Sequence, residues 1–578
     1  MLRITELRLP LEHDEAALRR AIVARLAVAD QALRAFTVFR RGYDARKRNA
    51  IHLVYTIDCE LAGDDASERR ILAQHADDSQ LRRSPDLRYH FVANVNTAAR
   101  DSGQHRPLVI GFGPCGVFAA LVLAQMGLAP IVLERGKRVR ERTQDTWGLW
   151  RRGVLDPESN VQFGEGGAGT FSDGKLWSQV SDPRHLSRKV LDEFVKAGAP
   201  EEILFVAKPH IGTFRLVGMV EKMRAEIEAL GGEIHFQQRI TDVFIEDGAI
   251  RGVSTAGGEQ WRSDHVVLAL GHSARDTFAM LHQRGVFMQA KPFSVGFRIE
   301  HPQGLIDKAR FGRNAGHPLL GAADYRLVHH AGNGRSVYSF CMCPGGTVVA
   351  ATSEAGHVVT NGMSQYSRNE RNANAGIVVG VTPQDYRQDG CSTGEVHPLD
   401  GIAFQRQWEA HAFALGGGNY DAPAQLVGDF LAARRSTALG GVLPSYQPGV
   451  KLTDLGGSVC PSLPPYAIAA IREALPAFER SIPGFAMHDA VLTGVETRTS
   501  SPLRIARGKN FQSVNTAGLY PAGEGAGYAG GIMSAAIDGI EVAQAVARSM
   551  LGLPEPAIDS REDDALKDRP RSLAPQTP

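Results

Sequence analysis

Residues 108–136 read LVIGFGPCGVFAALVLAQMGLAPIVLERG, and this stretch decides the fold of the chain. A short apolar run leads into Gly111-x-Gly113-x-x-Gly116, an Ala- and Leu-rich helical run follows, and a second apolar run ends at Glu134. In such a unit the first glycine permits a tight turn, the second lets the backbone approach a pyrophosphate, and the third brings helix and strand together. The helix N-terminus attracts phosphate, and an acid about 20 residues on accepts hydrogen bonds from ribose hydroxyls. The stretch therefore predicts a dinucleotide-binding βαβ unit.

Length and charge limit the classes of protein that the chain can represent. Its 578 residues predict several domains, because a single core rarely grows beyond about 250–300 residues. A net charge of +1 gives no reason to expect a nucleic-acid partner. No apolar run approaches the ~20 residues that span a bilayer, and the N-terminal residues lack an apolar signal region. Six scattered cysteines are typical of a reducing compartment, so we expect a cytoplasmic protein without a membrane span.

The residue pattern changes several times along the chain. Alternating apolar runs around a helical segment predict a small α/β domain before the nucleotide unit, and a Gly-rich, β-like region interrupts the α/β pattern after it. The predicted fold class is therefore α/β, with a Rossmann-like domain interrupted by a β-rich cap and preceded by a small α/β domain. The expected boundaries are 1–95 for the N-terminal domain, 96–107 for a linker, 108–289 and 456–550 for the nucleotide-binding domain, 290–455 for the cap or substrate domain, and 551–578 for a disordered tail.

Further glycine clusters indicate that the dinucleotide is FAD. Residues 163–174, FGEGGAGTFSDG, suit a loop whose amides and hydroxyls line a cofactor, and the apolar run 265–271 ends in glycine. Residues 518–543 combine a strand end, a Gly-rich turn and a helix whose N-terminus would stabilise negative charge on the flavin pyrimidine ring. The predicted cofactor-binding residues are Gly111, Gly113, Gly116, Glu134, Arg135, Gly166, Gly167, Gly169, Thr170, Ser172, Gly271, Gly523, Glu524, Gly530, Gly531 and Ile532.

Several motifs occur together in a recognisable order. They are NVQFGEGGAGTFSDGKL, KPFSVGFRIEHPQ, SFCMCPGGTVVAATSE, GVETRTSSPLRI and YPAGEGAGYAGGIMSAAIDG, besides the opening stretch. With them the chain resembles a family of bacterial FAD-dependent dehydrogenases within the glutathione-reductase-type flavoproteins, related to geranylgeranyl-reductase-like proteins. The resemblance covers nearly everything except the tail. It implies non-covalent FAD and an FAD domain interrupted by a cap, and it leaves the reaction open.

Two segments carry candidate catalytic residues. Cys341 and Cys343 would share a face of an extended strand, so both thiols could point into one pocket; we favour instead two small buried side chains. Glu496 and Arg498, in a polar run up to Ser501, could orient an acidic substrate or protonate a product, or could form a structural polar network. No His or Cys set predicts a metal site.

The leading hypothesis is an FAD-dependent oxidoreductase that transfers hydride between flavin N5 and a small-molecule substrate. No second Gly-x-Gly-x-x-Gly opens a helix, so NAD(P)H or another external electron donor or acceptor would have to reach the substrate cleft. Cys115 has no partner at the spacing of a disulfide reductase. Two alternatives remain open: a non-catalytic FAD-binding protein coupled to a partner through residues 1–95, and an RNA-modifying flavoenzyme using the basic residues of 40–48.

Overall fold

A parallel sheet forms the centre of the domain that contains residues 108–136. The computed structural model describes residues 1–95, 105–387, 394–457 and 459–554. The sheet has the order β22 (Leu519–Pro521), β11 (Val266–Leu268), β5 (Leu108–Ile110), β6 (Ile131–Leu133) and β7 (Glu233–His235), with every neighbouring pair parallel. Its central strands are wholly apolar because both faces of a parallel sheet are covered. This arrangement confirms the predicted Rossmann-like fold.

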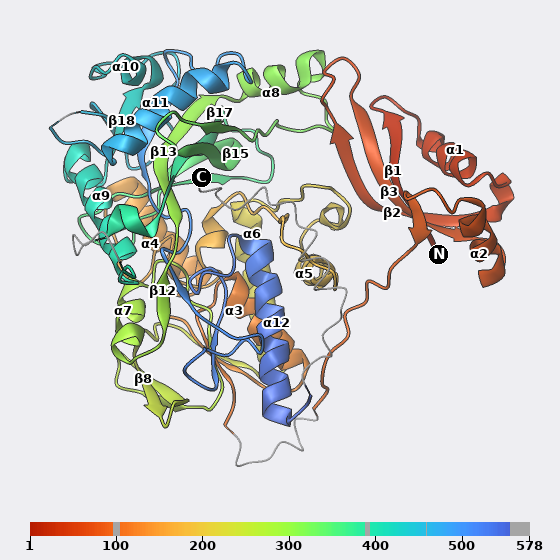
Figure 1. Cartoon of the computed structure of the whole chain (residues 1–578), viewed down its shortest axis with the longest axis horizontal. Helices are drawn as coiled ribbons and strands as arrows, with labels where there is room; N and C mark the ends of the chain where they lie inside the picture. The colour runs from red at the N-terminus through yellow and green to blue at the C-terminus, as the bar shows by residue number, and fades with distance from the viewer. Residues whose placement is uncertain (96–104, 388–393, 458, 555–578) are drawn as a thin grey trace.

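Helices and an antiparallel layer cover the two faces of this sheet. Alternate residues of each strand enter different cores: Val109 and Val267 face α3 (Pro114–Gln125) and α12 (Ile532–Leu551), and Ile110 and Leu268 face the other side. The two helices lie side by side (Figure 1). The remaining elements of this domain are α4 (Val139–Arg152), α5 (Leu186–Lys196), α6 (Thr213–Ala229), α7 (Arg275–Gln283), the antiparallel strands β8 (Ile240–Glu246), β9 (Ala249–Thr255) and β10 (Gln260–Arg262), and the pair β12 (Met288–Ala290) and β21 (Leu503–Ile505).

The N-terminal domain is a four-stranded antiparallel sheet with two helices. Its strands follow the order β2 (Leu33–Asp44), β3 (His52–Leu61), β1 (Leu2–Pro10) and β4 (Leu81–Arg83), and its helices are α1 (Glu15–Leu26) and α2 (Asp65–Gln74). The domain contacts the rest of the chain along β2. The Arg41 amide donates to the Phe205 carbonyl at 2.6 Å, and the Ala207 amide donates back to Arg41 at 2.9 Å. Figure 1 shows this sheet beside α8 (Gln303–Phe311).

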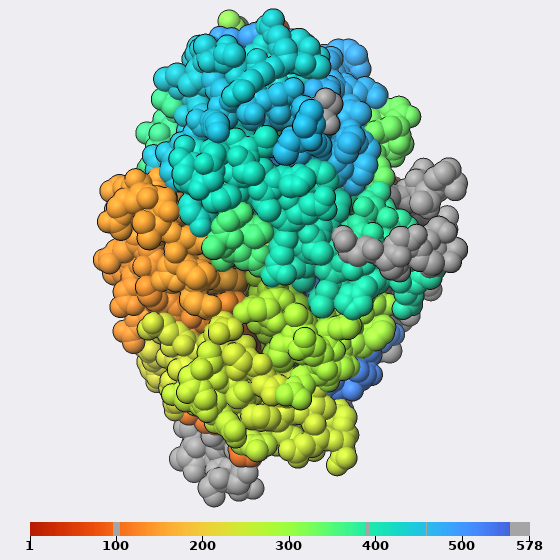
Figure 2. All heavy atoms as spheres, turned by 90° about the vertical axis from the view of Figure 1, so that its left-hand side faces the viewer, coloured from red at the N-terminus to blue at the C-terminus, as the bar shows by residue number. Residues whose placement is uncertain are grey.

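The cap is built on a large mixed sheet. Its strands are β14 (Val328–His330), β15 (Ser336–Ala350), β17 (Asn372–Val381), β13 (Phe293–Pro302), β20 (Val491–Glu496), β18 (Ala422–Leu426) and β19 (Val450–Leu452) in spatial order, with β16 (Thr360–Ser364) paired to β15. Helices α9 (Asp400–Gly416), α10 (Val427–Leu431) and α11 (Pro465–Glu479) pack around it. Figure 2 shows the cap, in green to blue, lying directly on segments of the Rossmann-like domain in orange and yellow.

One expected boundary differs from the structure. The sequence pattern assigns residues from 456 onward to the nucleotide-binding domain, but β20 pairs with β13 and β18 inside the cap sheet. The chain therefore leaves the cap after Glu496. In the sequence, α11 and β20 follow one another as a helix and a strand would in a Rossmann domain. The residue pattern therefore could not show where the chain leaves the cap and returns to the nucleotide-binding domain. Within the described ranges, no helix is long and apolar enough to cross a membrane.

Candidate functional site

A single large cavity runs between the three parts of the molecule. Its volume is about 1110 Å³. Gly113 of the Rossmann domain, Cys341 of the cap and Arg48 of the N-terminal domain all line it. Small-molecule pockets measure roughly 300–1,000 Å³, so the cavity is large enough for an extended ligand.

The N-terminus of α3 forms one end of the cavity. Gly113 is the N-cap residue, and no side chain caps the helix, so its first amides are free to meet a ligand. Gly111 has φ 98°, and a Cβ there would lie 2.6 Å from the Ala269 carbonyl oxygen. A Cβ on Gly113 would meet protein no closer than Gly167 Cα at 3.6 Å. Glycine at 111 is therefore required by the turn, whereas glycine at 113 leaves space for a ligand.

Glu134 closes this end of the cavity. Its carboxylate accepts hydrogen bonds from the backbone amides of Phe112 (2.8 Å), Gly136 (2.9 Å) and Gly164 (2.9 Å). The side chain thus joins the glycine turn to the 163–174 loop. A carboxylate offers about four acceptor positions, so these three bonds leave room for a ribose hydroxyl.

A second helix N-terminus opens into the same cavity. α12 begins after Gly531, which has no side-chain cap, and both Gly530 and Gly531 line the cavity. A Cβ on either glycine would meet no protein atom within 4 Å. Two uncapped helix N-termini facing one cavity suit a ligand that carries negative charge at two separated places, as the pyrophosphate and the reduced flavin ring of FAD do.

Most residues predicted to bind the cofactor line the cavity. These are Gly111, Gly113, Glu134, Arg135, Gly167, Gly169, Ser172, Gly271, Glu524, Gly530, Gly531 and Ile532. Four others, Gly116, Gly166, Thr170 and Gly523, lie behind its wall, where they permit close packing. A Cβ on Gly116 would lie 1.9 Å from the Gly111 carbonyl oxygen, and one on Gly523 would lie 2.9 Å from Cys115 Cβ.

The structure separates the candidate catalytic residues. Cys341, Glu496 and Arg498 line the cavity, but Cys343 is fully buried and does not. Cys343 is buried, as we favoured for both thiols, whereas Cys341 reaches the cavity, and the pairing of β15 with β17 shifts register between Phe340 and Cys343. A bulge of this kind redirects side chains that a regular strand would place together.

Two cations that the sequence analysis missed surround Cys341. Arg298 Nη1 donates to the Cys341 carbonyl at 2.9 Å, and its Nε donates to Glu496 at 2.6 Å. Lys175 Nζ donates to the Met342 carbonyl. The sequence could have indicated both residues. Arg298 interrupts the apolar run of 293–299, and Lys175 directly follows the Gly-rich loop of 163–174.

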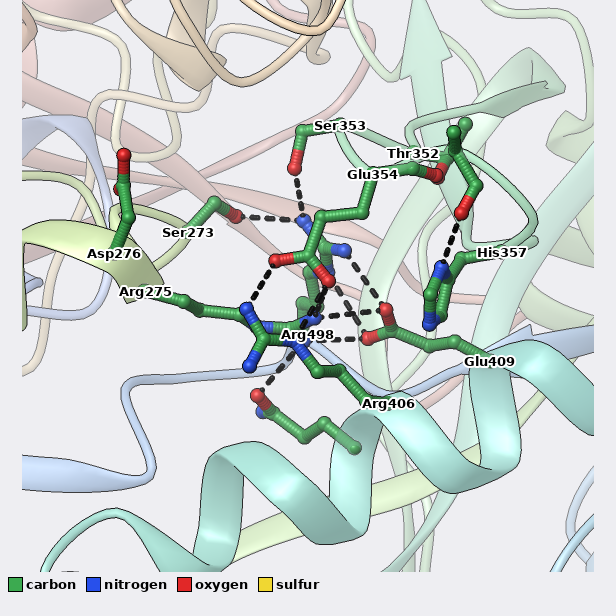
Figure 3. Close-up of polar contacts among 12 residues, drawn as sticks. Ser273, Arg275, Asp276, Thr352, Ser353, Glu354, His357, Arg406, Glu409 and Arg498 are labelled. Carbon is green, nitrogen blue, oxygen red and sulfur yellow. Dashed lines mark hydrogen bonds and ion pairs between the residues drawn. The ribbon is translucent and has the colours of Figure 1, made fainter. Parts of the chain in front are cut away.

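Arg498 belongs to a buried network that joins the cap to the Rossmann-like domain (Figure 3). Glu409 of α9 accepts from Arg498 at 2.8 Å and from Arg275 of α7 at 2.6 Å, and Glu354 binds Arg275 at 3.1 Å. Burial alone would raise the pKa of Glu409, but the two guanidinium groups hold it well below its usual range. The structural alternative for Arg498 is thus the better description, since Glu409, Ser273 and Ser353 occupy its donors.

Glu524 and His272 contribute titratable groups to the cavity wall. Burial raises the pKa of the Glu524 carboxyl to about 7, while Lys291 opposes the shift. Burial lowers the pKa of His272 to about 3, and the charges of Arg498 and Arg275 add to this effect. Near neutral pH, therefore, Glu524 can hold or release a proton, whereas His272 is neutral.

These features define a class of protein, the FAD-dependent flavoproteins, and comparison with known proteins agrees. Residues 292–499 match a family described as FAD-dependent protein, C-terminal domain-like, residues 181–356 match FAD dependent oxidoreductase, and residues 1–60 match a domain of unknown function. A protein of Clostridium beijerinckii, described as an uncharacterized protein, is 45% identical over 548 residues, which cover 94% of this chain and 98% of the clostridial one.

Matches among solved structures are more distant. The glycerol-3-phosphate dehydrogenase from Bacillus halodurans complexed with FAD is 12% identical, with a TM-score of 0.33, covering 79% of this chain and 66% of that chain. The glycine oxidase from Bacillus cereus is 11% identical, with a TM-score of 0.34, covering 79% of this chain and 99% of that chain.

The chain belongs to the family of the clostridial protein, and within it residues 181–356 and 292–499 match an FAD dependent oxidoreductase family and an FAD-dependent C-terminal domain. The predicted cofactor, FAD, is thereby confirmed. The residues present fit it: the glycine cradle at Gly113 and Gly167 and the open helix N-termini leave space where a dinucleotide needs it.

Proposed function

We propose that the protein transfers hydride between FAD and a small, negatively charged molecule that enters the cavity from the end opposite the α3 N-terminus. When bound, the flavin supplies the hydride-transfer chemistry at N5. The supporting observation is the continuity of the cavity, which reaches from Gly113 past Ser172 and Cys341 to Tyr325 and Arg48. Such a cavity accommodates a dinucleotide and a substrate together.

The charge of the far end favours an anionic substrate. Arg48, Arg310 and Arg326 come from the β2–β3 hairpin, α8 and the loop before β14, and all three line the cavity. In the part of the chain that the structure describes, their guanidinium groups form no ion pair, whereas Lys208 pairs with Asp324 at 2.6 Å. Unpaired positive charges around the opening of a cavity attract anions and raise their local concentration.

Residues between the two ends would hold the substrate and move its proton. Lys175 has donors left to bind a carbonyl or carboxylate oxygen after its bond to the Met342 carbonyl. Glu524, with a pKa of about 7, can give or take a proton near neutral pH. We further propose that the chain lies on the glutathione-reductase-type branch of flavoproteins, which the Gly-x-Gly-x-x-Gly and Glu134 arrangement supports.

Anaerobic reduction of the purified yellow protein tests this function. Carboxylates such as 2-hydroxy acids and amino acids, their neutral methyl esters, NADH and NADPH would each be mixed with the protein while the visible flavin absorbance is followed. We expect bleaching by at least one anionic donor and not by its ester. A yellow protein that none of these donors reduces contradicts the proposal and favours the non-catalytic alternative.

Substitution of the unpaired arginines tests the substrate charge. Arg310→Ala and Arg326→Ala should raise the KM for the anionic donor severalfold, more at low salt than at high salt, without changing flavin content. Arg313→Ala is the matched control, because Arg313 is exposed near α8 but does not line the cavity. An equal change in KM for Arg313→Ala would contradict the assignment of these arginines.

A further inference from the structure

Cys341 occupies an unusual position on the cavity wall. It follows the point at which β15 loses register with β17, and its φ is 41°, a value that non-glycine residues rarely adopt. Strained positions of this type persist only when the surroundings hold them. Here two cations do so, since the buried Arg298 binds the Cys341 carbonyl and the half-buried Lys175 binds the next carbonyl along the chain.

Positive charges outnumber negative ones around Cys341 while Glu524 is protonated. Three cations, Lys175, Arg298 and Arg368, face Asp173 and Glu496. Glu524, whose pKa burial raises to about 7, adds a third carboxylate that is partly protonated near neutral pH. Arg298 and Asp173 are at most 1% exposed, whereas Lys175 and Arg368 are 23% and 15% exposed, so solvent screens the excess positive charge only in part. A buried charge without a counter-charge is expensive, so the cluster favours one more anion at its centre.

Hydrogen-bond donors around the thiols are also in excess. Asn374 is fully buried beside Arg298 and Cys343, and its Nδ2 has no acceptor among the described residues. The Cys343 sulfur lies 3.4 Å from the Cys341 carbonyl oxygen, and its single proton can be donated either there or to the Cys341 sulfur. An unsatisfied buried amide donor is rare and costs about 1–3 kcal/mol, so it indicates a missing acceptor in this cluster.

We propose that Cys341 is a thiolate nucleophile of the cavity, stabilised by Lys175, Arg298 and the Cys343 thiol, and that it reacts with soft carbon electrophiles that enter beside the flavin site. Cys343 stays protonated and acts as its donor. The site exists whether or not the proposed substrate is correct, because it rests on the charge balance of the cap and the 163–175 loop.

The electrostatics of the pair agree with this division of roles. A hydrogen bond from Cys343 is the main cause that holds the pKa of Cys341 well below its usual range, with Lys175 and Arg298 adding to it. The same interaction and burial place the pKa of Cys343 well above its usual range. Two carboxylates also face the Cys341 sulfur and disfavour its ionised form. They are Asp173, from the 163–174 loop, and Glu524, from the turn between β22 and α12.

Alkylation of the holoprotein by iodoacetamide measures the state of Cys341 directly. The thiolate forms the S–C bond while iodide leaves with the C–I electron pair, and an already ionised thiol releases no proton. The rate at the Cys341 peptide, followed by mass spectrometry between about pH 5.5 and 9, should reach half its maximum below pH 7, against about 8.5 for an ordinary thiol. Exposed Cys460 in the same sample shows reagent access.

Variants separate the thiolate from mere exposure. Lys175→Met should shift the half-maximum of Cys341 alkylation upward by at least about one pH unit, which lowers the rate about tenfold at pH values well below both half-maxima. Lys208→Met is the matched control, because Lys208 also lines the cavity but pairs with Asp324 and forms no hydrogen bond with a cysteine among the described residues. Cys343→Ala should raise the half-maximum and Cys343→Ser should restore part of the difference.

The charge of the reagent gives a second measurement. Iodoacetate should react with Cys341 faster relative to iodoacetamide than it does with Cys460, since excess cations attract the carboxylate. The flavin-free protein is tested alongside, because bound FAD could shield the thiol. A half-maximum near pH 8.5 in both forms, or no alkylation of Cys341 in either form at any pH, contradicts the proposal.

Discussion

Glu134 shows how one side chain can shape a binding site. By accepting three backbone amides it ties the glycine turn to the 163–174 loop, two segments that together line the cavity. Its position at the end of β6 could be predicted from the sequence, because strand, turn, helix and acid follow one another within 30 residues. A motif whose parts follow one another along the chain can be recognised from the sequence alone.

Lys175, Arg298 and Glu409 could not be assigned in the same way. Each gains its role from partners far along the chain: Arg298 from Glu496, Lys175 from Met342, and Glu409 from Arg275 and Arg498. Spacing in the sequence carries no information on such pairs. A charged residue inside an apolar strand, as at Arg298, signals a buried partner but does not name it.

Glu524 makes stability depend on pH. Its folded-state pKa of about 7 lies above the ordinary value of about 4.3, so the folded protein retains a proton that the unfolded chain releases between these values. The free energy of unfolding should therefore fall as pH rises through this window. Glu524→Gln cannot ionise, so its melting temperature relative to the wild type, measured without flavin, should rise between pH 5 and 8. Parallel melting curves would show that the carboxyl does not titrate there.

At the scale of elements, α7 and α9 are joined by the network of Figure 3. Arg275 begins α7, Glu409 lies within α9, and Arg498 follows β20, so one carboxylate connects the cap to the FAD-binding domain. Both guanidinium groups and the Glu409 carboxylate are at most 3% exposed. Each of these charges needs its partner, because removing one member of a buried ion pair leaves an uncompensated charge and strongly destabilises the fold.

Removal of the Glu409 charge should separate these elements. Glu409→Gln leaves two buried guanidinium groups facing each other and should cost about 3–5 kcal/mol in the free energy of unfolding, measured by urea denaturation followed by circular dichroism. Glu354→Gln is the control, since Glu354 is 22% exposed and binds Arg275 from the rim. We expect a clearly smaller loss from the control, and equal losses would refute the central role of Glu409.

At the scale of the whole molecule, the cavity needs all three parts of the chain. The fold class could be predicted because each domain has its own residue pattern, and the N-terminal domain was expected as a separate unit. The position of this domain at the far end of the cavity could not be predicted, because the contacts that fix it, such as the hydrogen bond from the Arg41 amide to the Phe205 carbonyl, belong to no sequence motif. The end of the cap at Glu496 could not be predicted for the same reason, because β20 belongs to the cap sheet through its pairing with β13 and β18.

Docking of the N-terminal domain can be tested through Tyr43. Its ring meets Phe311 of α8 with centroids 5.6 Å apart. Tyr43→Ala should increase hydrogen exchange at the Arg41 and Ala207 amides, which bridge the domains, while flavin content stays unchanged because the FAD end of the cavity lies elsewhere. Phe39→Ala, whose ring stacks on Arg3 inside the N-terminal domain, is the control. Unchanged exchange in Tyr43→Ala would mean that this contact does not hold the domain.

FAD titration of Gly113→Val tests the central claim that this cavity is the flavin site. The new side chain would point into the cavity, where only Gly167 Cα lies within 4 Å of its Cβ, so the fold should persist while pyrophosphate space is lost. Gly218→Val, at a position with no neighbour within 4 Å and outside the cavity, is the control. We expect one FAD per chain in the wild type and in Gly218→Val. Gly113→Val should bind FAD at least about a hundredfold more weakly, at an unchanged melting temperature of the flavin-free protein. Wild-type affinity in Gly113→Val would contradict it.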